Sequence, residues 1–537
     1  MLCDLHKMKS EKLKFSTYPV VIGFLCSLGT LLRIRQFLSD RSLWLDEAML
    51  ALNIVTRSFS ELLEPLLHSQ AAPLGFLFFE KIIVKLFGNH EFSLRIFPLL
   101  MGVIAIFLML RVTKAYVGDS GCFLGLGLFV LSEKLIYYSS EVKQYSSDVT
   151  LTLALLLLAP KCFEPNASPK RLMTFALAAS VCVWFSHPIV FVIGGIFAAL
   201  IVDVLCERKA RTQQKLFWIG LAALICAGSF YLTFAISLKG ITGNAGLVEF
   251  WQDAFMPMPP WANLNWFAKT AYSLLNDVLG LYVVPAPQAL QNFVVAITAA
   301  SLFFIGTIAL FLKRWQLSLV VILPFVLTLI ASSLHKYPFS GRLMCFCIPL
   351  LILPIAEGTE QVRTFVRRLS PRGAVYSTAV IVAVLAYGSL VRDLQNFYSP
   401  PMREHIRPAM AYLSHNRLPS DFIYAGYVHH DAVPGVEYYA SAFGFRQAVY
   451  GIHANSGEYG KSSFLAVEKW VNDKNSSMQL KRVWFVFTHT CGSCRPDEDR
   501  QIVGHLDSMG PRLLTFTSEG ASVYLYDVSK GAIPKQF

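Results

Sequence analysis

The sequence Trp44-Leu45-Asp46-Glu47-Ala48 follows directly on the first of eleven apolar stretches, all of which lie in the first 391 residues. Apolar runs of about 18 residues, bounded by charges, are typical of membrane-spanning helices. A carboxylate near the membrane plane is costly unless it has a role or a partner. Two adjacent carboxylates at this place therefore favour chemistry at the bilayer surface over a purely structural membrane protein.

Composition supports a membrane protein. The 537 residues are 54% hydrophobic and only 15% charged, with a mean hydropathy of +0.49, whereas soluble proteins carry about 25% charged residues. The short alternating segments of a β-barrel are not seen. The net charge is +12, but the basic residues form short clusters between apolar stretches, as topology determinants do. We therefore expect membrane lipids, and no nucleic acid, as partners.

The predicted spans follow one another with short connections. The first, residues 17–38, lacks a small-residue cleavage site before Arg33 and Arg35, which favours a retained span over a signal peptide. The predicted spans are residues 17–38, 91–112, 121–138, 145–161, 171–187, 188–206, 215–236, 290–312, 315–334, 341–357 and 373–391.

Basic residues gather in alternate connections, which is the positive-inside pattern. The lysines at positions 7, 9, 12 and 14 place the N-terminus in the cytoplasm by the same rule. The other basic clusters are Arg111 and Lys114; Lys161, Lys170 and Arg171; Arg208, Lys209, Arg211 and Lys215; Lys313 and Arg314; and Arg363, Arg367, Arg368 and Arg372. The remaining connections, residues 39–90, 139–144, 187, 237–289 and 335–340, then face outward together with the tail.

The outward loop 39–90 contains an ambiguous apolar stretch, Pro73 to Phe87. It is short for a span and carries Glu80, Lys81 and Lys85, so an interfacial amphipathic helix is predicted. A span here would invert the topology downstream and break the positive-inside pattern.

The chain divides into residues 1–394, a polytopic membrane domain, and residues 395–537, a soluble outward domain. Asp421–Tyr427, Arg482–Phe487 and Ala521–Asp527 have the pattern of strands, and residues 463–472 and 497–509 that of helices. This alternation predicts an α/β fold. Cys491 and Cys494 in this tail fit a local disulfide or two free thiols equally well.

Three outward clusters contain residues suited to catalysis. Asp46 and Glu47 are candidates for a general base, because one carboxylate of a pair can have its pKa raised by the other; the plainer interpretation is a solvated helix cap. Glu141-Val-Lys-Gln-Tyr145 offers Lys143 to a phosphate or a carboxylate, while an interfacial anchor with a local ion pair is the alternative.

The third cluster is His335-Lys-Tyr-Pro-Phe-Ser-Gly-Arg342. Arg342 at the start of a span can hold a phosphate bidentately, and His335 and Lys336 beside it favour anion binding over simple snorkelling. His187 is a weaker candidate, since a lone His at a span end is more often structural. Asp253 is a candidate polar contact for a sugar or an acceptor.

Together the clusters place a base, several cations and aromatic residues on one outward face. A leaving phosphate needs positive charge and an acceptor hydroxyl needs a base. The combination fits group transfer from an anionic donor embedded in the membrane.

The sequence resembles the membrane glycosyltransferases of the GT-C fold, and within them the bacterial relatives of protein O-mannosyltransferases and of the lipid A aminoarabinose transferase. The resemblance is strong over residues 15–200 and patchy to 345. Its motifs are Trp44–Ala48, Ala72-Pro-Leu-Gly-Phe-Leu-Phe-Phe-Glu80, Phe87-Gly-Asn-His-Glu-Phe-Ser-Leu-Arg95, Glu141–Tyr145 and Tyr337-Pro-Phe-Ser-Gly-Arg342.

The resemblance implies about 11 transmembrane helices and inverting transfer of a sugar from a polyprenyl-phosphate donor to a glycan, lipid or protein acceptor. It assigns the catalytic carboxylate to Asp46 and a helping role to Glu47. Glu141, Lys143, Tyr145, His335, Lys336, Tyr337 and Arg342 are candidates for the donor phosphate or substrate by their location. Some relatives bind a divalent metal, but no metal-ligand spacing occurs in this sequence, so no metal ligand is carried over.

The expected location is the bacterial inner membrane, with the tail periplasmic or extracellular and a role in cell-envelope glycans. Two other interpretations stay open. A transporter or flippase for lipid-linked glycans would also have many spans and intramembrane polar residues, although an inverted repeat, which would favour it, is not seen. An assembly protein whose outward domain binds a partner would function without Asp46. The sequence does not identify the sugar or the acceptor.

Overall fold

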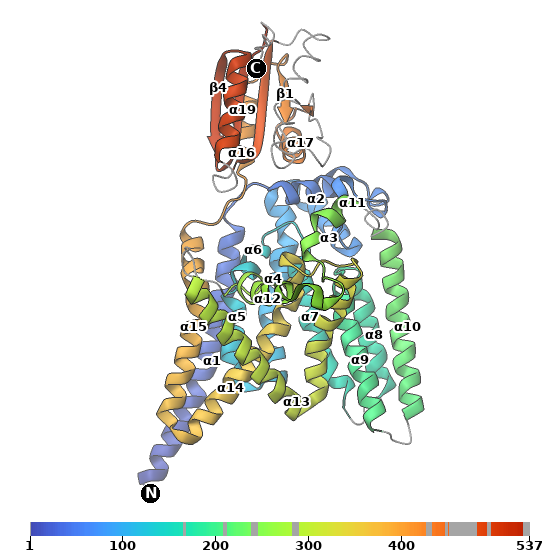
Figure 1. Cartoon of the computed structure of the whole chain (residues 1–537), viewed down its shortest axis with the longest axis vertical. Helices are drawn as coiled ribbons and strands as arrows, with labels where there is room; N and C mark the ends of the chain where they lie inside the picture. Colours follow the sequence, from blue (N-terminus) through green and yellow to red (C-terminus); the bar gives the residue numbers. More distant parts are fainter. Residues whose placement is uncertain are drawn as a thin grey trace.

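The structure is a computed structural model that describes residues 2–164, 168–207, 212–237, 245–281, 289–425, 432–445, 449–450, 481–490 and 496–529. Figure 1 shows a bundle of long helices with a small sheet domain above it. The N-terminus lies at the lower end of the bundle and the C-terminus at the top of the sheet domain.

Every predicted apolar stretch is helical, as expected. The bundle consists of α1 (Leu2–Phe37), α4 (Glu91–Tyr116), α5 (Asp119–Val130), α6 (Glu133–Tyr138), α7 (Tyr145–Leu158), α8 (Pro169–Val183), α9 (Ile189–Glu207), α10 (Thr212–Ser237), α13 (Ala289–Ser333), α14 (Ile348–Leu369) and α15 (Pro371–Tyr398). Seven helices of the described part are long and apolar enough to cross a membrane. The helical, multi-pass membrane fold is therefore confirmed.

One predicted span differs in detail, and two others are joined in one helix. Residues 121–138 form two helices, α5 and α6, because Ser132 starts α6 at its N-cap and its hydroxyl donates to the Leu279 carbonyl (3.3 Å). The predicted spans 290–312 and 315–334 are the two legs of α13, which bends at Arg314 (φ −152°, ψ 75°). Figure 1 shows this bend at the lower end of the bundle. A bend at Lys313 and Arg314 lets both cations reach the polar boundary of the membrane.

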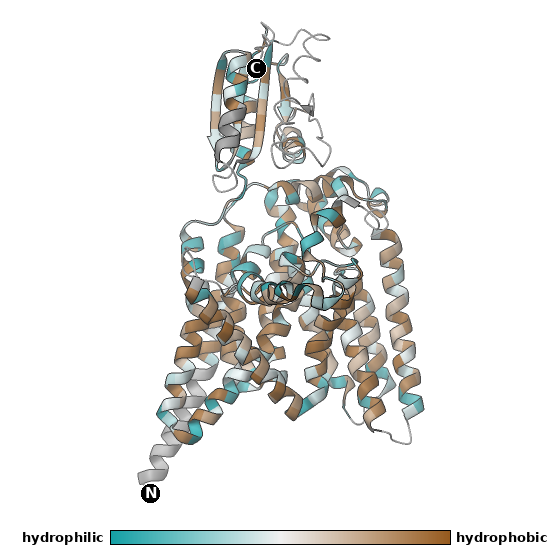
Figure 2. Ribbon diagram, in the orientation of Figure 1, coloured by the Kyte–Doolittle hydropathy of each residue, from teal (hydrophilic) through white to brown (hydrophobic). Residues whose placement is uncertain are grey.

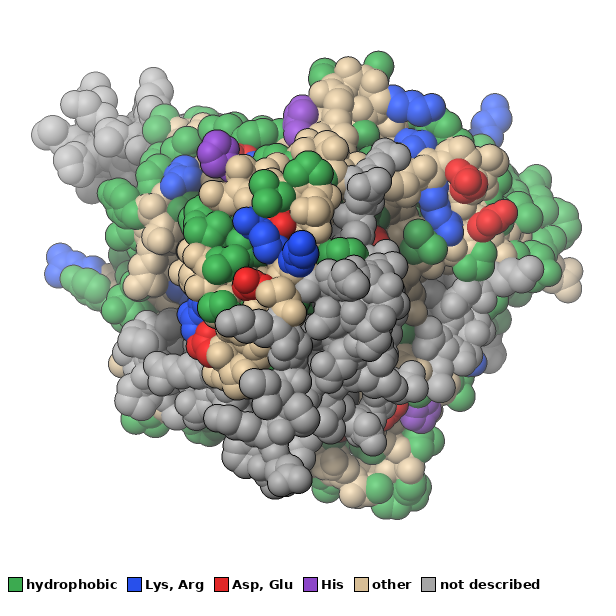
Figure 3. Space-filling view, turned by 90° about the horizontal axis from the view of Figure 1, so that it is seen from above, with side chains coloured by type: hydrophobic (Ala, Val, Ile, Leu, Met, Phe, Trp, Pro, Cys, Tyr) green, Lys and Arg blue, Asp and Glu red, His purple; other side chains and the backbone are tan. Residues whose placement is uncertain are grey.

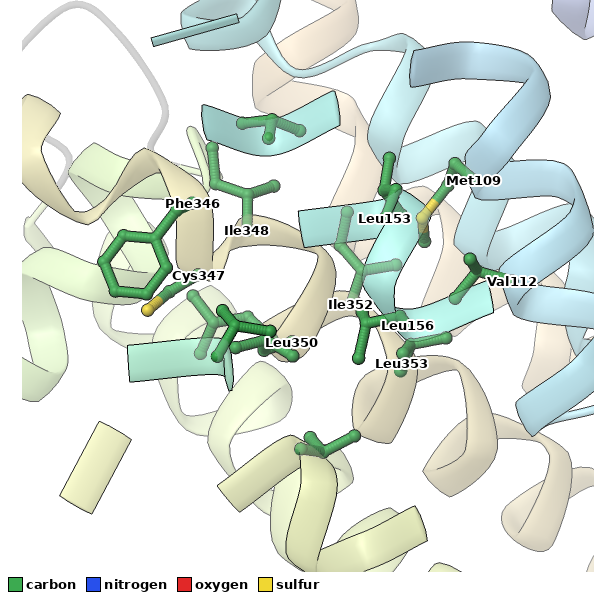
Figure 4. Close-up of a cluster of buried hydrophobic side chains, with 14 of the residues drawn as sticks. Met109, Val112, Leu153, Leu156, Phe346, Cys347, Ile348, Leu350, Ile352 and Leu353 are labelled. Carbon is green, nitrogen blue, oxygen red and sulfur yellow. The ribbon is translucent and has the colours of Figure 1, made fainter. Parts of the chain in front are cut away.

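The core of the bundle is a continuous apolar cluster in which α4, α7 and α14 meet. Figure 4 shows Met109 of α4, Leu153 of α7 and Ile352 of α14 pointing toward one another. All three side chains are fully buried. Their packing fixes α7, which follows the 139–145 turn, against α14, which follows the segment that contains Arg342.

Several short elements lie in the upper half of the bundle (Figure 1). They are α2 (Leu45–Thr56), η1 (Glu61–Leu63), η2 (Leu67–Ser69), α3 (Leu74–Phe87), α11 (Ala245–Phe250), η4 (Gln252–Ala254), η5 (Pro260–Asn263), α12 (Leu264–Ser273), η6 (Leu274–Val278) and η7 (Gly341–Cys347). Figure 2 shows hydrophilic residues concentrated here and at the lower ends of the helices, with hydrophobic residues between. The expected helix over Pro73–Phe87 is α3, and its interfacial placement stays a prediction.

The tail folds into an α/β domain, as predicted. Its elements are α16 (Ile406–Asn416), β1 (Phe422–Ala425), α17 (Val433–Ala442), β2 (Val449–Tyr450), β3 (Arg482–Thr490), α19 (Pro496–Met509), β4 (Arg512–Ser518) and β5 (Gly520–Asp527). The strand order is β2-β1-β3-β5-β4, with β1 parallel to β2 and β3, and β5 antiparallel to β3 and β4. α16 and α17 cover one face of the sheet, and α19 covers the other.

The predicted elements of the tail match in part. The strands at Arg482–Phe487 and Ala521–Asp527 are β3 and β5, and the helix over 497–509 is α19. The strand predicted over Asp421–Tyr427 is β1, which ends at Ala425 within the described part. The helix expected over 463–472 and the cysteines Cys491 and Cys494 lie outside the described residues. The domain boundary between 394 and 395 stays a prediction.

Candidate active site

Asp46 is the second residue of α2 and is bound by two cations from distant parts of the chain. Its Oδ1 accepts a hydrogen bond from Lys143 Nζ (3.0 Å), and its Oδ2 forms an ion pair with a terminal guanidinium nitrogen of Arg342 (2.7 Å). The carboxylate keeps 16% of its side-chain surface accessible. The structure therefore joins the first, second and third sequence clusters at one carboxylate.

The environment of Asp46 favours its ionised form. Burial on its own raises the pKa of this carboxyl, but the charges of Lys143 and Arg342, with hydrogen bonds from Lys143 and Gln70, hold the pKa below its usual value. In the absence of a ligand Asp46 is thus a carboxylate whose charge is neutralised by two cations.

Glu47 points away from Asp46 into the protein and is fully buried. Arg95 binds it through two nitrogens, Nε to Oε1 (3.0 Å) and a terminal nitrogen to Oε2 (2.8 Å). The backbone N–H groups of Val142 (2.9 Å) and Trp44 (3.4 Å) also donate to it. Because these four donors engage both oxygens, Glu47 fixes the start of α2 against the 139–145 turn.

Glu141 in that turn is fully buried, and neither of its carboxylate oxygens has a hydrogen-bond partner in the described part of the chain. Burial, and then the nearby charge of Glu47, raises the pKa of Glu141 to about 7. Lys143, two residues later, also donates a hydrogen bond to Gln70 Oε1 (2.6 Å). Gln70 is therefore a site residue that the sequence analysis did not identify.

Three further arginines surround the carboxylates. Arg41 stacks on Tyr137 (4.3 Å to the ring centre) and lies 3.8 Å from Glu47 Oε2. Arg95 is the last residue of the motif Phe87–Arg95, so the sequence offered a reason to consider it as a site residue. No motif pointed to Arg41 or Arg403. The cluster holds more cations than carboxylates: Arg41, Arg95, Lys143, Arg342 and Arg403 surround Asp46, Glu47 and Glu141. Such an excess favours an anionic ligand.

Other predicted residues line the surroundings of this cluster. Tyr145 is buried at the start of α7 with its ring 4.8 Å from that of Tyr138. The Tyr337 hydroxyl donates to the Leu343 carbonyl (2.8 Å), which holds the loop that carries Arg342. These two tyrosines act on the shape of the site.

The structure does not bring the remaining candidates to Asp46. His335 and Lys336 are exposed, and the His335 ring packs on Phe255 (4.8 Å). Asp253 is exposed on η4, where its backbone carbonyl accepts from Trp266 Nε1 (3.0 Å). His187 lies between α8 and α9, and its Nε2 has no partner among the described residues.

The described residues contain no group of three or more His, Cys, Asp or Glu side chains that could hold a metal ion. Asp46 and Glu47 are instead paired with lysine and arginine. We therefore assign no metal ligand.

The sheet domain contacts the loop before α2 and the start of α4. Arg407 binds Asp40 (2.7 Å) and Glu91 (3.1 Å), and the Tyr439 hydroxyl donates to Glu91 (2.8 Å). Figure 3 views the molecule from the side of this domain and shows lysine and arginine side chains beside aspartate and glutamate on this face. The loop before α2 is thus held from above as well as from within the bundle.

Comparison with known proteins supports this architecture. Residues 71–231 match the family model described as dolichyl-phosphate-mannose-protein mannosyltransferase. Among curated proteins, none matches the chain by sequence.

Solved structures of similar fold cover nearly the whole chain. One is ArnT from Cupriavidus metallidurans bound to undecaprenyl phosphate, with 12% identity, a TM-score of 0.55, and coverage of 96% of this chain and 99% of that one. Another is the archaeal oligosaccharyltransferase AglB from Archaeoglobus fulgidus, in complex with an inhibitory peptide and a dolichol-phosphate, with 11% identity, a TM-score of 0.51, and coverage of 95% and 74%.

Proposed function

This chain has the GT-C fold of membrane glycosyltransferases, and from that premise we propose that it is an inverting glycosyltransferase. It moves a sugar from a polyprenyl-phosphate donor to an acceptor hydroxyl. Asp46 acts as the general base, and Lys143 and Arg342 bind the donor phosphate.

One observation carries the proposal. A partly accessible carboxylate, Asp46, lies within 3.0 Å of a lysine and an arginine that come from two other loops. General-base transfer needs a carboxylate near the acceptor hydroxyl, and departure of a phosphate needs cations near its oxygens. Both requirements meet at this one point of the structure.

The proposed reaction is a single displacement. Asp46 removes the proton of the acceptor hydroxyl as that oxygen attacks the anomeric carbon. The bond from this carbon to the phosphate oxygen breaks, and its electron pair stays with the phosphate. The configuration at the anomeric carbon is inverted. The phosphate gains one negative charge as it leaves, which Lys143 and Arg342 stabilise.

The positions of neighbouring groups support the assignment of roles. Glu47 has four donors on its two oxygens, so it is a positioning residue that holds α2. In the 139–145 turn, the Val142 N–H donates a hydrogen bond to Glu47. This bond holds the turn against α2, so that Lys143, the next residue, lies beside Asp46.

The comparisons support a lipid-linked donor. The ArnT structure contains undecaprenyl phosphate, and the AglB structure contains a dolichol-phosphate and a peptide. We propose the same donor class for this chain, with a glycan, lipid or protein as acceptor.

We further propose that the site faces the outer side of the bacterial inner membrane. The bend of α13 and the turn between α14 and α15 carry Arg314, Arg367 and Arg372 at the same end of the bundle as the N-terminus (Figure 1). Positive charge at this end favours a cytoplasmic location, which leaves the sheet domain periplasmic or extracellular.

The test compares purified wild type with Asp46→Asn, using a panel of polyprenyl-phosphate sugars and measuring release of polyprenyl phosphate. Transfer to added glycan, lipid and protein acceptors is followed in parallel. Asp277→Asn is a matched control, because Asp277 is exposed and bonds only to Ser273 in the described structure.

We expect Asp46→Asn to bind donor but to release at least about 100-fold less polyprenyl phosphate, since general-base catalysis contributes about 10²–10⁴ in rate. Equal turnover in wild type and Asp46→Asn removes Asp46 from the mechanism. Donor binding without turnover in both proteins, across the acceptor panel, favours transport of lipid-linked glycans instead.

A further inference from the structure

We propose that Arg403, in the segment between α15 and the sheet domain, is a third cation for the donor phosphate, so that the C-terminal domain completes the active site. This inference rests on the proposed function. The Arg403 guanidinium lies 4.5 Å over the ring of Trp44 and 5.0 Å over that of Tyr137. Trp44 immediately precedes α2, two residues before Asp46.

Arg403 and Arg342 share the same aromatic residue. The Arg342 guanidinium lies 5.5 Å from the centre of the Trp44 ring. Two guanidinium groups on one indole repel each other, and an anion bound to both removes that repulsion. Arrangements of this kind therefore favour binding of a phosphate.

Among the described residues, no ion pair neutralises the charge of Arg403. Arg342 and Lys143 are paired with Asp46, and Arg95 is paired with Glu47. Arg403 has no salt bridge with any carboxylate of the described residues, although Glu141 contributes to its electrostatic environment. Its side chain is exposed, while the Trp44 and Tyr137 rings beneath it are buried. The guanidinium is thus positioned and accessible to a ligand.

The backbone around Arg403 is held from both sides. On the side of α2, Glu404 Oε2 accepts a hydrogen bond from the Leu45 N–H (3.0 Å). On the side of the sheet, His405 N–H donates to the Glu519 carbonyl (2.7 Å), and the Ser518 hydroxyl donates to the His405 carbonyl (2.7 Å).

The turn between β4 and β5 fits tightly against this segment. Gly520 has a positive φ of 69°, and a Cβ there would lie 2.3 Å from the Arg403 carbonyl oxygen. The sheet domain therefore determines where Arg403 lies, and an arginine from the tail enters a site whose other parts come from the membrane domain.

The chemistry of the reaction gives Arg403 a specific role. The donor phosphate is a diester with one negative charge, and the product is a monoester that carries up to two. A third cation therefore stabilises the leaving phosphate more than the bound donor. We expect Arg403 to act on the affinity for polyprenyl phosphate as well as on turnover.

The experiment measures binding of undecaprenyl phosphate to the full-length protein in detergent, with undecaprenol as the uncharged comparison. The variants are Arg403→Gln, Arg403→Lys and Arg342→Gln. Arg417→Gln is the matched control, because Arg417 belongs to the same domain and also stacks on an aromatic ring, that of Phe445 (4.7 Å). Thermal unfolding of each variant shows that the fold is kept.

We expect Arg403→Gln to weaken binding of undecaprenyl phosphate at least about tenfold and to leave binding of undecaprenol unchanged. Arg403→Lys keeps the charge and restores most of the affinity, while Arg417→Gln matches wild type. A structural role alone would lower the unfolding temperature and affect both ligands equally.

Two outcomes overturn the inference, and they are distinguishable. If wild type prefers undecaprenyl phosphate to undecaprenol, Arg342→Gln loses this preference and Arg403→Gln keeps it, then only the role of Arg403 fails. If wild type binds the two ligands equally, then the proposed phosphate site fails, and the role of Arg403 fails with it.

Discussion

Adjacent carboxylates have different surroundings here because successive residues of a helix point about 100° apart. Asp46 faces Lys143 and Arg342 at an accessible position, while Glu47 faces Arg95 and the Val142 N–H in the interior. In the proposed mechanism, the same sequence motif thus supplies Asp46 for the reaction and Glu47 for the position of the helix.

We predict that Glu47→Gln destabilises the protein much more than it changes the chemistry. The substitution leaves the buried Arg95 without its counter-charge, and breaking one partner of a buried ion pair costs about 3–5 kcal/mol. Thermal unfolding in detergent measures the effect. Glu249→Gln, at an exposed position on α11, serves as the control. An unchanged unfolding temperature for Glu47→Gln would contradict the positioning role.

We predict that the reaction rate depends on pH differently in the free enzyme and in the donor complex, because the pKa of Asp46 differs between them. In the free enzyme the charges of Lys143 and Arg342 hold the pKa of Asp46 below its ordinary value, so Asp46 stays ionised further into the acid range than a free aspartate. A donor phosphate that binds the same cations weakens their hold on Asp46, and the pKa of Asp46 rises. The profile of kcat/KM reports the free enzyme and that of kcat the complex.

The acidic limb of kcat therefore lies at higher pH than that of kcat/KM. In Arg342→Gln one of the two cations is already lost, so the acidic limb of kcat/KM also moves to higher pH. Superimposed acidic limbs in wild type would show that the phosphate does not compete with Asp46 for these cations.

At the scale of the elements, α13 and α14 cross with their backbones in contact. A Cβ at Gly306 would lie 1.8 Å from the Pro354 carbonyl oxygen, and one at Gly358 would lie 2.0 Å from the Leu302 carbonyl oxygen. Small residues allow such approach between membrane helices. The crossing holds α14, which follows η7, and η7 carries Arg342, a proposed ligand of the donor phosphate.

We predict that Gly306→Ala and Gly358→Ala each destabilise the bundle by about 3 kcal/mol, since a carbonyl group of a packed helix cannot move aside. Gly220→Ala in α10 has nothing within 4 Å of the new methyl group, and it stabilises slightly because alanine favours helix by up to about 1 kcal/mol. Thermal unfolding of the three variants tests the crossing. Equal behaviour of all three would argue against it.

At the scale of the whole molecule, the basic residues at the lower end of the bundle predict how the protein is oriented in the membrane. In the predicted orientation, the lower end faces the cytoplasm and the candidate site, at the upper end, faces outward. Cys206 at the end of α9 and Lys269 of α12 are both exposed and lie on opposite sides by this topology. In a chain with Cys3, Cys491 and Cys494 replaced by serine, a membrane-impermeant maleimide should label Lys269→Cys in intact cells. Cys206 should react only after permeabilisation. The reverse pattern would place the site in the cytoplasm.

The sequence by itself determined the class of the protein and most of its elements. Long apolar runs have no stable alternative to helices in a bilayer, so residues 91–112 or 373–391 could be assigned without a structure. The strand β3 was likewise visible as a buried apolar run, and β5 as an alternating pattern. The boundary at Lys313 and Arg314, where α13 bends, was also predicted, because two charges interrupt the apolar run there. The break at Ser132 was not, because its hydroxyl bonds to the carbonyl of Leu279, which is distant in the sequence.

Only the tertiary structure decided which polar residues meet. Lys336 and Arg342 are six positions apart in one loop and looked equivalent, yet η7 turns Arg342 to Asp46 while Lys336 remains exposed. Arg403 had no signal at all, because its place depends on a contact with Trp44 that spans most of the chain. Local patterns record the environment of a segment, whereas a site built from residues 46, 143, 342 and 403 depends on how distant segments pack.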